Sequence, residues 1–209
     1  MKTNKSVWTY ILFFGAIWGI LEATLGYVLQ FLPPLVSGSV MFPIAAMLMI
    51  LSYQNTKSKS AMIYVAAIAA TIKAVNFFLP GLPPIKTYNP MIAIMLQSLV
   101  MVVFIPLIEK KPILVKALGI AIVGLSWRTL FLANISINYA LTGFNFPQLA
   151  STASMLNLVV YLGLMEAFVL GAFYSLQFVL KNKVKFTFRP NLILSVSTFV
   201  VAVLLTFFL

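Results

Sequence analysis

The stretch "VWTYILFFGAIWGILEATLGYVLQFL" runs from Val7 to Leu32 and decides the class of fold. Glu22 is its only charged residue. A helix needs about 20 predominantly apolar residues to cross the hydrocarbon core of a bilayer. The stretch is also too long for the apolar region of a cleaved signal peptide. We therefore expect it to be retained as the first membrane-spanning helix.

The composition of the whole chain supports the same class. Of its 209 residues, 62% are hydrophobic and only 8% are charged, whereas soluble domains carry about 25% charged residues. A soluble protein of this composition would expose more apolar surface than water tolerates. The sequence predicts an all-α, multi-pass protein of the cell membrane, folded as a single domain over residues 1–209.

Apolar segments recur along the chain and are separated by short polar or Pro-rich connections. Pro33 and Pro34 are expected to end the first segment, because neither can donate a backbone hydrogen bond. The second segment is short for a membrane span. The predicted helices cover residues 7–32, 39–53, 61–79, 91–108, 113–140, 154–180 and 192–209.

The basic residues predict the orientation of these seven helices. Eleven of the 14 Lys and Arg residues lie before the first helix, in alternate connections or, for Lys116, just inside the helix that follows one of these connections. One, Lys86, lies on the opposite side. Cytoplasmic loops carry such an excess of positive charge. The N-terminus is therefore expected in the cytoplasm and the C-terminus outside. The same distribution explains the net charge of +11 without a nucleic-acid partner.

Several kinds of chemistry lack their usual residues. The chain has no Cys and no His, and its three acidic residues are all Glu. It therefore lacks the commonest metal ligand and general base, and it contains no P-loop motif. We expect no metal, no cofactor and no enzymatic activity.

Four ionisable residues lie inside predicted helices: Glu22, Lys73, Arg128 and Glu166. Each costs roughly 2.5–3.5 kcal/mol near a helix centre, so it needs a partner or a function. At a rise of about 1.5 Å per residue, Glu22 matches Lys73 in depth, and Arg128 matches Glu166. The pattern predicts these two pairs, either as structural ties or as part of a binding or coupling site.

Other residues are candidates for the same site. Asn76, Gln97 and Trp127 lie within predicted helices and could line a polar cavity. The Pro-rich outer loops hold Lys86, Tyr88 and Asn89, which are candidate gate residues. The alternative for these loops is an interfacial aromatic belt with tight turns.

The first helix also carries small residues at four-residue spacing, namely Gly15, Gly19 and Ala23. Small residues at this spacing allow a second helix to approach closely. That helix belongs either to a partner protein or to the same chain, and the sequence does not distinguish the two.

These features together resemble the substrate-binding S component of energy-coupling factor (ECF) transporters. The resemblance covers residues 1–185 as an overall pattern, and the helix at 190–209 is additional to the six helices usual in that family. It implies a bacterial protein in which Gly15, Gly19 and Ala23 dock a coupling transmembrane subunit, which itself works with an ATPase pair. It also implies outer loops that close over a vitamin-like substrate.

The expected function is therefore the capture of a small organic solute for uptake, energised by separate ATP-driven proteins. One alternative is a stand-alone secondary transporter that uses Glu22 or Glu166 in proton coupling. Another is a scaffold or assembly subunit in which the buried charges are only structural ties.

Overall fold

The computed structural model describes residues 4–29, 34–109, 112–183 and 189–208. In these ranges the chain is mostly helical and forms no strand. The helices are α1 (Asn4–Ala23), α2 (Leu25–Leu29), α3 (Pro34–Thr56), α4 (Ser60–Lys73), α5 (Ile85–Glu109), α6 (Ile113–Thr142), α7 (Thr152–Leu156), α8 (Leu162–Lys183) and α9 (Leu192–Phe208). Short 3₁₀ turns η1 (Ala74–Phe78) and η2 (Pro147–Leu149) and a π-helical turn η3 (Asn157–Tyr161) join or extend them.

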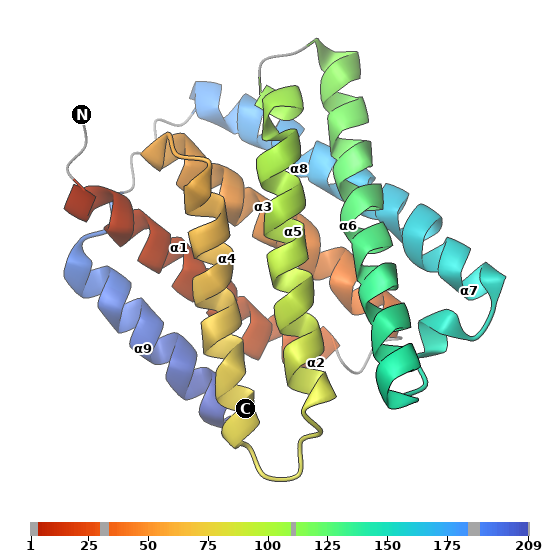
Figure 1. The fold of residues 1–209 in the computed structure, drawn as a ribbon. Coiled ribbons are helices and arrows are strands. Elements are labelled where there is room, and N and C mark those ends of the chain that lie inside the picture. Colours follow the sequence, from red (N-terminus) through yellow and green to blue (C-terminus); the bar gives the residue numbers. More distant parts are fainter. Residues whose placement is uncertain (1–3, 30–33, 110–111, 184–188, 209) are drawn as a thin grey trace.

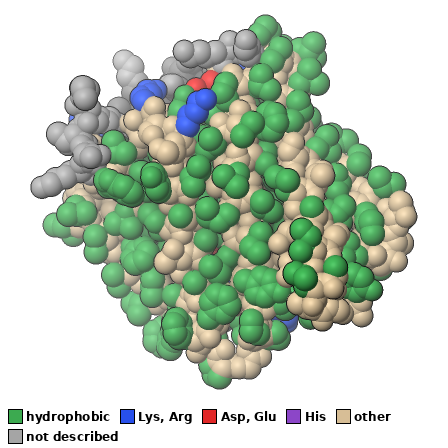
Figure 2. Space-filling model, viewed as in Figure 1, with side chains coloured by type: hydrophobic (Ala, Val, Ile, Leu, Met, Phe, Trp, Pro, Cys, Tyr) green, Lys and Arg blue, Asp and Glu red, His purple; other side chains and the backbone are tan. Residues whose placement is uncertain are grey.

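Five of these segments are long and apolar enough to cross a membrane. They are Ser6–Ala23, Ser60–Phe78, Ile85–Glu109, Ile113–Thr142 and Thr152–Leu176. α9 is apolar but shorter. Large apolar side chains such as Val103 and Phe168 are 65% and 79% exposed, and Figure 2 shows one face of the molecule covered largely by such side chains. This surface is suited to lipid rather than to water.

Six helices form a closed arrangement in which each packs against its neighbours. The order around it is α1, α4, α5, α6, α8 and α3, and α3 returns to α1. Figure 1 shows α4, α5 and α6 as successive antiparallel helices, and α9 beside α1. The start of α1 and the end of α9 lie at opposite ends of the bundle (Figure 1).

The second helix is longer than predicted. α3 begins at Pro34 and continues past Pro43 to Thr56. A Pro in the first turn costs little, because its missing N–H would have no intrahelical partner there. At the other end, Asn55 Nδ2 donates to the carbonyl of Leu51 at 2.8 Å, and Thr56 Oγ1 donates to that of Ser52 at 2.8 Å. The helix therefore extends beyond its apolar core, and the prediction of a short segment at 39–53 was wrong.

α9 packs along α1, and the two helices run in the same direction. The Ser195 hydroxyl of α9 donates to the backbone carbonyl of Thr9 at 3.0 Å. Further along, Ala16 and Ala202 are completely buried in one cluster with Ile72 of α4. The additional C-terminal helix is thus an integral neighbour of the first helix.

Candidate functional site

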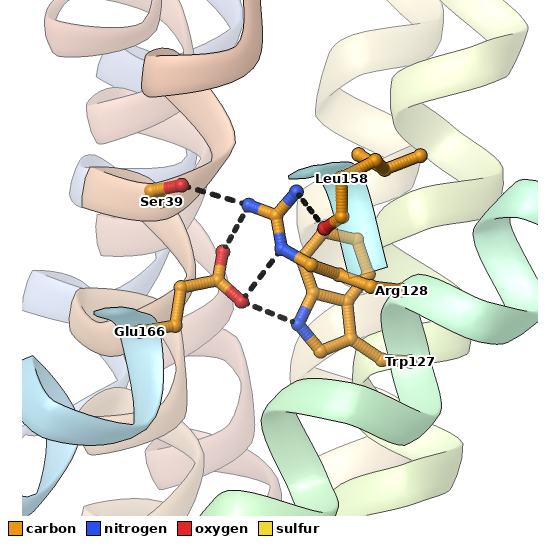
Figure 3. A network of polar contacts seen from close by, with 5 residues as sticks. All are labelled: Ser39, Trp127, Arg128, Leu158 and Glu166. Atoms are coloured by element: carbon orange, nitrogen blue, oxygen red, sulfur yellow. Dashed lines mark hydrogen bonds and ion pairs between the residues drawn. The ribbon is translucent and has the colours of Figure 1, made fainter. Parts of the chain in front are cut away.

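The predicted pair between Arg128 and Glu166 is confirmed, and it lies at the centre of a buried polar network. Arg128 of α6 is 2% exposed and Glu166 of α8 is fully buried. Arg128 Nη2 donates to Glu166 Oε1 at 2.6 Å, and its Nε donates to Oε2 at 3.0 Å. Figure 3 shows this two-pronged geometry, which is the strongest arrangement available to a guanidinium and a carboxylate.

The remaining groups of this pair also have partners. Arg128 Nη2 donates to Ser39 Oγ of α3 at 2.8 Å, and Nη1 donates to the Leu158 carbonyl at 3.3 Å. Trp127 Nε1 donates to Glu166 Oε2 at 2.9 Å. The network therefore ties α3, α6 and α8 together (Figure 3), and its charges are compensated within the protein.

The backbone brings Arg128 and Glu166 together through two local features. The first is a direct contact between α6 and α8, where a Cβ at Gly124 would collide with the carbonyl oxygen of Gly163. Gly124 lies one helical turn before Arg128, so the helices are closest beside the pair. The second is the π-helical turn η3, which contains Leu158, the residue whose carbonyl accepts from Arg128. Such turns disturb the regular helical hydrogen bonds and are frequent at functional sites.

The other predicted pair, Glu22 with Lys73, does not form a contact. Among the described residues, the only ion pair within 4.0 Å is that of Arg128 with Glu166. Glu22 Oε1 instead accepts from Trp18 Nε1 at 3.1 Å, and no hydrogen bond of Oε2 is found in the described ranges. We call Glu22 and Lys73 the open pair.

Lys73 is a largely buried charged residue without an ion-paired partner among the described residues. It is 7% exposed, and its ammonium makes no hydrogen bond or ion pair to any described residue. It lies in the last turn of α4, where the helix dipole favours a cation. That position lowers the cost of the buried charge, but it does not supply the oxygen acceptors that an ammonium normally has.

Of the other predicted site residues, Trp127 belongs to the ion-paired network, whereas Gln97 and Asn76 make no hydrogen bond to it in the described ranges. Gln97 of α5 is 6% exposed, and its side chain makes no hydrogen bond with the described residues. Asn76 lies in η1, the turn that begins directly after α4 ends at Lys73. No hydrogen bond in the described ranges joins the Gln97 or Asn76 side chain to the open pair. Trp127 belongs to the Arg128–Glu166 network, where its ring also lies 4.9 Å from the Arg128 guanidinium carbon.

The candidate gate residues lie in a helix rather than in a loop. α5 begins at Ile85, earlier than the predicted residue 91, so Lys86, Tyr88 and Asn89 all lie in its first turns. The Tyr88 hydroxyl donates to Asn138 Oδ1 at 3.1 Å, and Asn89 Oδ1 accepts from Asn134 Nδ2 at 3.1 Å. Tyr88 and Asn89 therefore join α5 to α6 at this end of the bundle. Lys86 is exposed.

The small residues of α1 are covered by the same chain. A Cβ at Gly15 or Gly19 would lie within 3.0 Å of side-chain atoms of Ile68 or Ile72 in α4. Ala23 is 6% exposed. Of the two possibilities that the spacing left open, the structure has the internal one, and the close packing of these residues requires no second protein.

Two surface grooves lie away from both pairs. One, of about 750 Å³, runs between α6 and α8 and is lined by residues that include Lys116, Phe168 and Gly171. The other, of about 450 Å³, runs between α5 and α6 beside Val103 and Thr129. Both are mostly apolar and open.

The sequence analysis did not identify Ser39 or the Leu158 carbonyl, although both bind Arg128. A single Ser in an apolar helix and a backbone carbonyl have no distinguishing pattern, so no signal in the sequence could have found them. Asn138 was missed for a related reason, since its partner Tyr88 was expected in a loop.

Comparison with known proteins does not identify the chain. No protein-family model, no curated protein and no solved structure matches it. A function can therefore be argued only from the charges and contacts of the buried residues.

Proposed function

We propose that this protein is a membrane-embedded subunit that captures a small organic solute, and that the open pair of Glu22 and Lys73 is its binding site. The observation that carries the proposal is Lys73, a side chain only 7% exposed for which no hydrogen bond or ion pair to the described residues is found. A buried charge without compensation is expensive. A ligand that supplies acceptors to Lys73 removes that cost on binding.

The contrast with Arg128 and Glu166 supports this assignment. That pair has a full set of protein partners, as expected of a structural tie. Glu22 and Lys73 form no ion pair within 4.0 Å, and a site that is to admit a ligand needs such unused groups. We therefore assign the pair Arg128 and Glu166 as a tie and the pair Glu22 and Lys73 as a site.

The location of the open pair fits capture from outside the cell. Lys73 lies toward the end of the bundle that contains η1 and the start of α5. On the face drawn in Figure 2, Lys and Arg side chains lie near the opposite end, and a further one is visible at the lower edge. If the basic end is cytoplasmic, Glu22 and Lys73 lie in the outer half of the membrane. A solute arriving from outside then has the shorter path to them.

Uptake needs a source of energy. The sequence has no P-loop motif, so we propose that a separate ATP-driven module energises release to the inside. The main rival is a stand-alone carrier coupled to protons. Glu22 supports that rival, because no hydrogen bond to its Oε2 is found in the described ranges, whereas both oxygens of Glu166 are engaged with Arg128. Of the two residues considered for a proton relay, Glu22 and Glu166, we therefore propose Glu22 for this rival.

Retention of a solute tests the capture function. Native mass spectrometry of the purified protein is expected to show a bound small molecule, and Lys73→Met is expected to weaken its binding by about 10–100-fold, because a hydrogen bond to a charged group contributes about 1.5–3 kcal/mol. Lys116→Met is the matched control, since it removes the same charge at the other end of the bundle. Equal binding by wild type and Lys73→Met would contradict the assignment of the site.

Transport in vesicles separates capture from the proton-coupled rival. Vesicles that contain only this protein are expected to bind the solute without accumulating it under a proton gradient. Accumulation without ATP that is lost in Glu22→Gln would select the carrier instead. A chain that neither binds nor transports any solute would favour the scaffold role.

We also propose that the chain crosses the membrane seven times with its N-terminus in the cytoplasm. Cysteine labelling tests this topology. The chain has no Cys, so single introduced cysteines report without background. In intact cells, an impermeant maleimide is expected to label Lys86→Cys and Phe208→Cys, and to label Lys59→Cys only after permeabilisation. Labelling of Lys59→Cys in intact cells would reverse the orientation. Protection of Phe208→Cys alone would mean an even number of spans.

A further inference from the structure

We infer that the groove between α6 and α8 binds one acyl chain of an anionic phospholipid, whose phosphate contacts Lys116. The groove has a volume of about 750 Å³ and mostly apolar walls with few polar groups, as is typical of a cleft that binds a largely apolar ligand. Neither member of the open pair lines it. The inference therefore does not depend on the proposed function.

The groove begins where α6 and α8 separate from their closest contact. At that contact a Cβ on Gly124 would collide with the Gly163 carbonyl oxygen, so no space is left between the two backbones. About two turns later on α8, a Cβ at Gly171 meets no atom within 4 Å. The helices thus diverge toward the start of α6 and the end of α8 (Figure 1). Small residues such as Ala167 and Ala172 keep the space between them open.

The length of the groove matches one leaflet of a bilayer. On α8 its lining extends from Ala167 to Ser175, which corresponds to about 12 Å along the helix axis. Half of the hydrocarbon core of a bilayer is about 15 Å thick. An acyl chain that enters at the membrane interface therefore has room to lie along the groove until the contact of Gly124 with Gly163 closes it.

The polar groups of the groove lie at the depth of lipid headgroups. Lys116 is within one turn of the start of its apolar span at Ile113, and Tyr174 is within one turn of the end of its span at Leu176. Lys116 Nζ lies 5.5 Å from the centre of the Tyr174 ring, a contact that positions the ammonium between the two helices. Tyr and Lys side chains are suited to this depth, because each has an apolar body and a polar end.

Lys116 provides the preference for an anionic lipid. It is the only charged residue among the described residues that line the groove, and no ion pair of Lys116 within 4.0 Å is found in the described ranges. The face of the Tyr174 ring attracts the ammonium but is not an oxygen acceptor. A lipid phosphate supplies such an acceptor, and basic pockets between membrane helices bind anionic headgroups in this way.

A membrane-spanning helix of a second protein fits the groove less well. Such a helix is about 30 Å long, whereas the groove closes about two turns from its open end. Close helix pairs also need small residues along the whole contact. Here the large side chains of Ile113 and Phe168 line the same groove and are 80% and 79% exposed. They hold a second helix axis away, whereas a flexible acyl chain packs between them.

Retention of lipids in native mass spectrometry tests the headgroup contact. The probes are phosphatidylglycerol and phosphatidylcholine with identical acyl chains, added in equal amounts to the delipidated full-length protein in detergent. The wild type is expected to bind phosphatidylglycerol about fivefold more tightly, the factor that one Lys contributes near anionic lipid. Lys116→Met is expected to lose this preference. Lys59→Met is the matched control, because it removes an exposed charge at the same end of the bundle and is expected to keep the preference.

Gly171→Leu tests the position of the acyl chain. The new side chain enters the groove without a collision at its Cβ. It is expected to weaken the binding of both lipids about tenfold, as if roughly two CH₂ groups of the chain lost their place in the groove. The melting temperature without added lipid is expected to be no lower than that of the wild type, which shows that the variant is folded.

Three results would overturn the inference. Equal binding of the two lipids by the wild type, or an equal loss of preference in Lys59→Met and Lys116→Met, would mean that this groove does not select the headgroup. Unchanged lipid binding by a folded Gly171→Leu would place the chain elsewhere. A protein partner that binds the wild type but not Gly171→Leu, with no lipid retained by either, would assign the groove to a helix of that partner.

Discussion

Replacing Arg128 by Met is expected to destabilise the bundle by about 3–5 kcal/mol, the typical cost of removing one member of a buried ion pair. The substitution leaves the fully buried Glu166 carboxylate with the Trp127 indole as its one remaining donor from Figure 3. It also removes the partner of Ser39 Oγ and of the Leu158 carbonyl. The free energy of unfolding, measured by denaturant titration in mixed micelles, reports the loss.

Two further variants test whether the charge or the geometry of Arg128 matters. Arg128→Met combined with Glu166→Met is expected to recover much of the loss, because no uncompensated charge then remains. Arg128→Lys keeps the charge but loses the planar fork, so an intermediate stability is expected. Lys116→Met, on the same helix, is the control and is expected to keep the stability of the wild type. If Arg128→Met is also as stable as the wild type, the network is not a structural tie.

Gly124→Ala is expected to cost about 1–3 kcal/mol or more, even though Ala is intrinsically the better helix former. The added methyl group would collide with the Gly163 carbonyl oxygen. Backbone cannot move aside as a flexible side chain can, so α6 and α8 must separate. That movement also pulls Arg128 away from Glu166, and the packing defect and the electrostatic defect are therefore coupled.

Gly171→Ala is the matched control for this prediction. Gly171 lies on α8, and a Cβ built there meets no atom within 4 Å. The same substitution is therefore expected to stabilise the protein by about 0.5–1 kcal/mol through helix propensity alone. Opposite signs for the two variants in a thermal melting assay would verify the close contact. A neutral or stabilising Gly124→Ala would contradict it.

The sequence was sufficient for the class of fold and for one of the two pairs. Apolar length and the scarcity of charge predict membrane helices for a general physical reason, namely that lipid cannot hydrogen-bond an exposed backbone. Depth matching correctly paired Arg128 with Glu166. The same rule paired Glu22 with Lys73, which share a region of the bundle but do not touch. Depth is a single coordinate, and contact also depends on how each helix is rotated and on the side-chain rotamers.

The small residues of α1 illustrate a second limit. Spacing correctly showed that a helix approaches Gly15 and Gly19 closely, but it could not show that this helix is α4 of the same chain. The identity of a neighbour depends on how all the helices pack, which is not a local property. For the same reason the sequence did not reveal that Ser39 reaches Arg128 across 89 positions of the chain.

The parallel contact of α9 with α1 has a consequence for biosynthesis. The two atoms of the Ser195–Thr9 hydrogen bond are 186 residues apart, and ribosomes add about 5–20 residues per second. The first helix to enter the membrane therefore waits roughly 10–40 s for its last neighbour to be made. During that interval one side of α1 faces lipid or the insertion machinery. The native contacts of α1 are therefore complete only after α9 has been made.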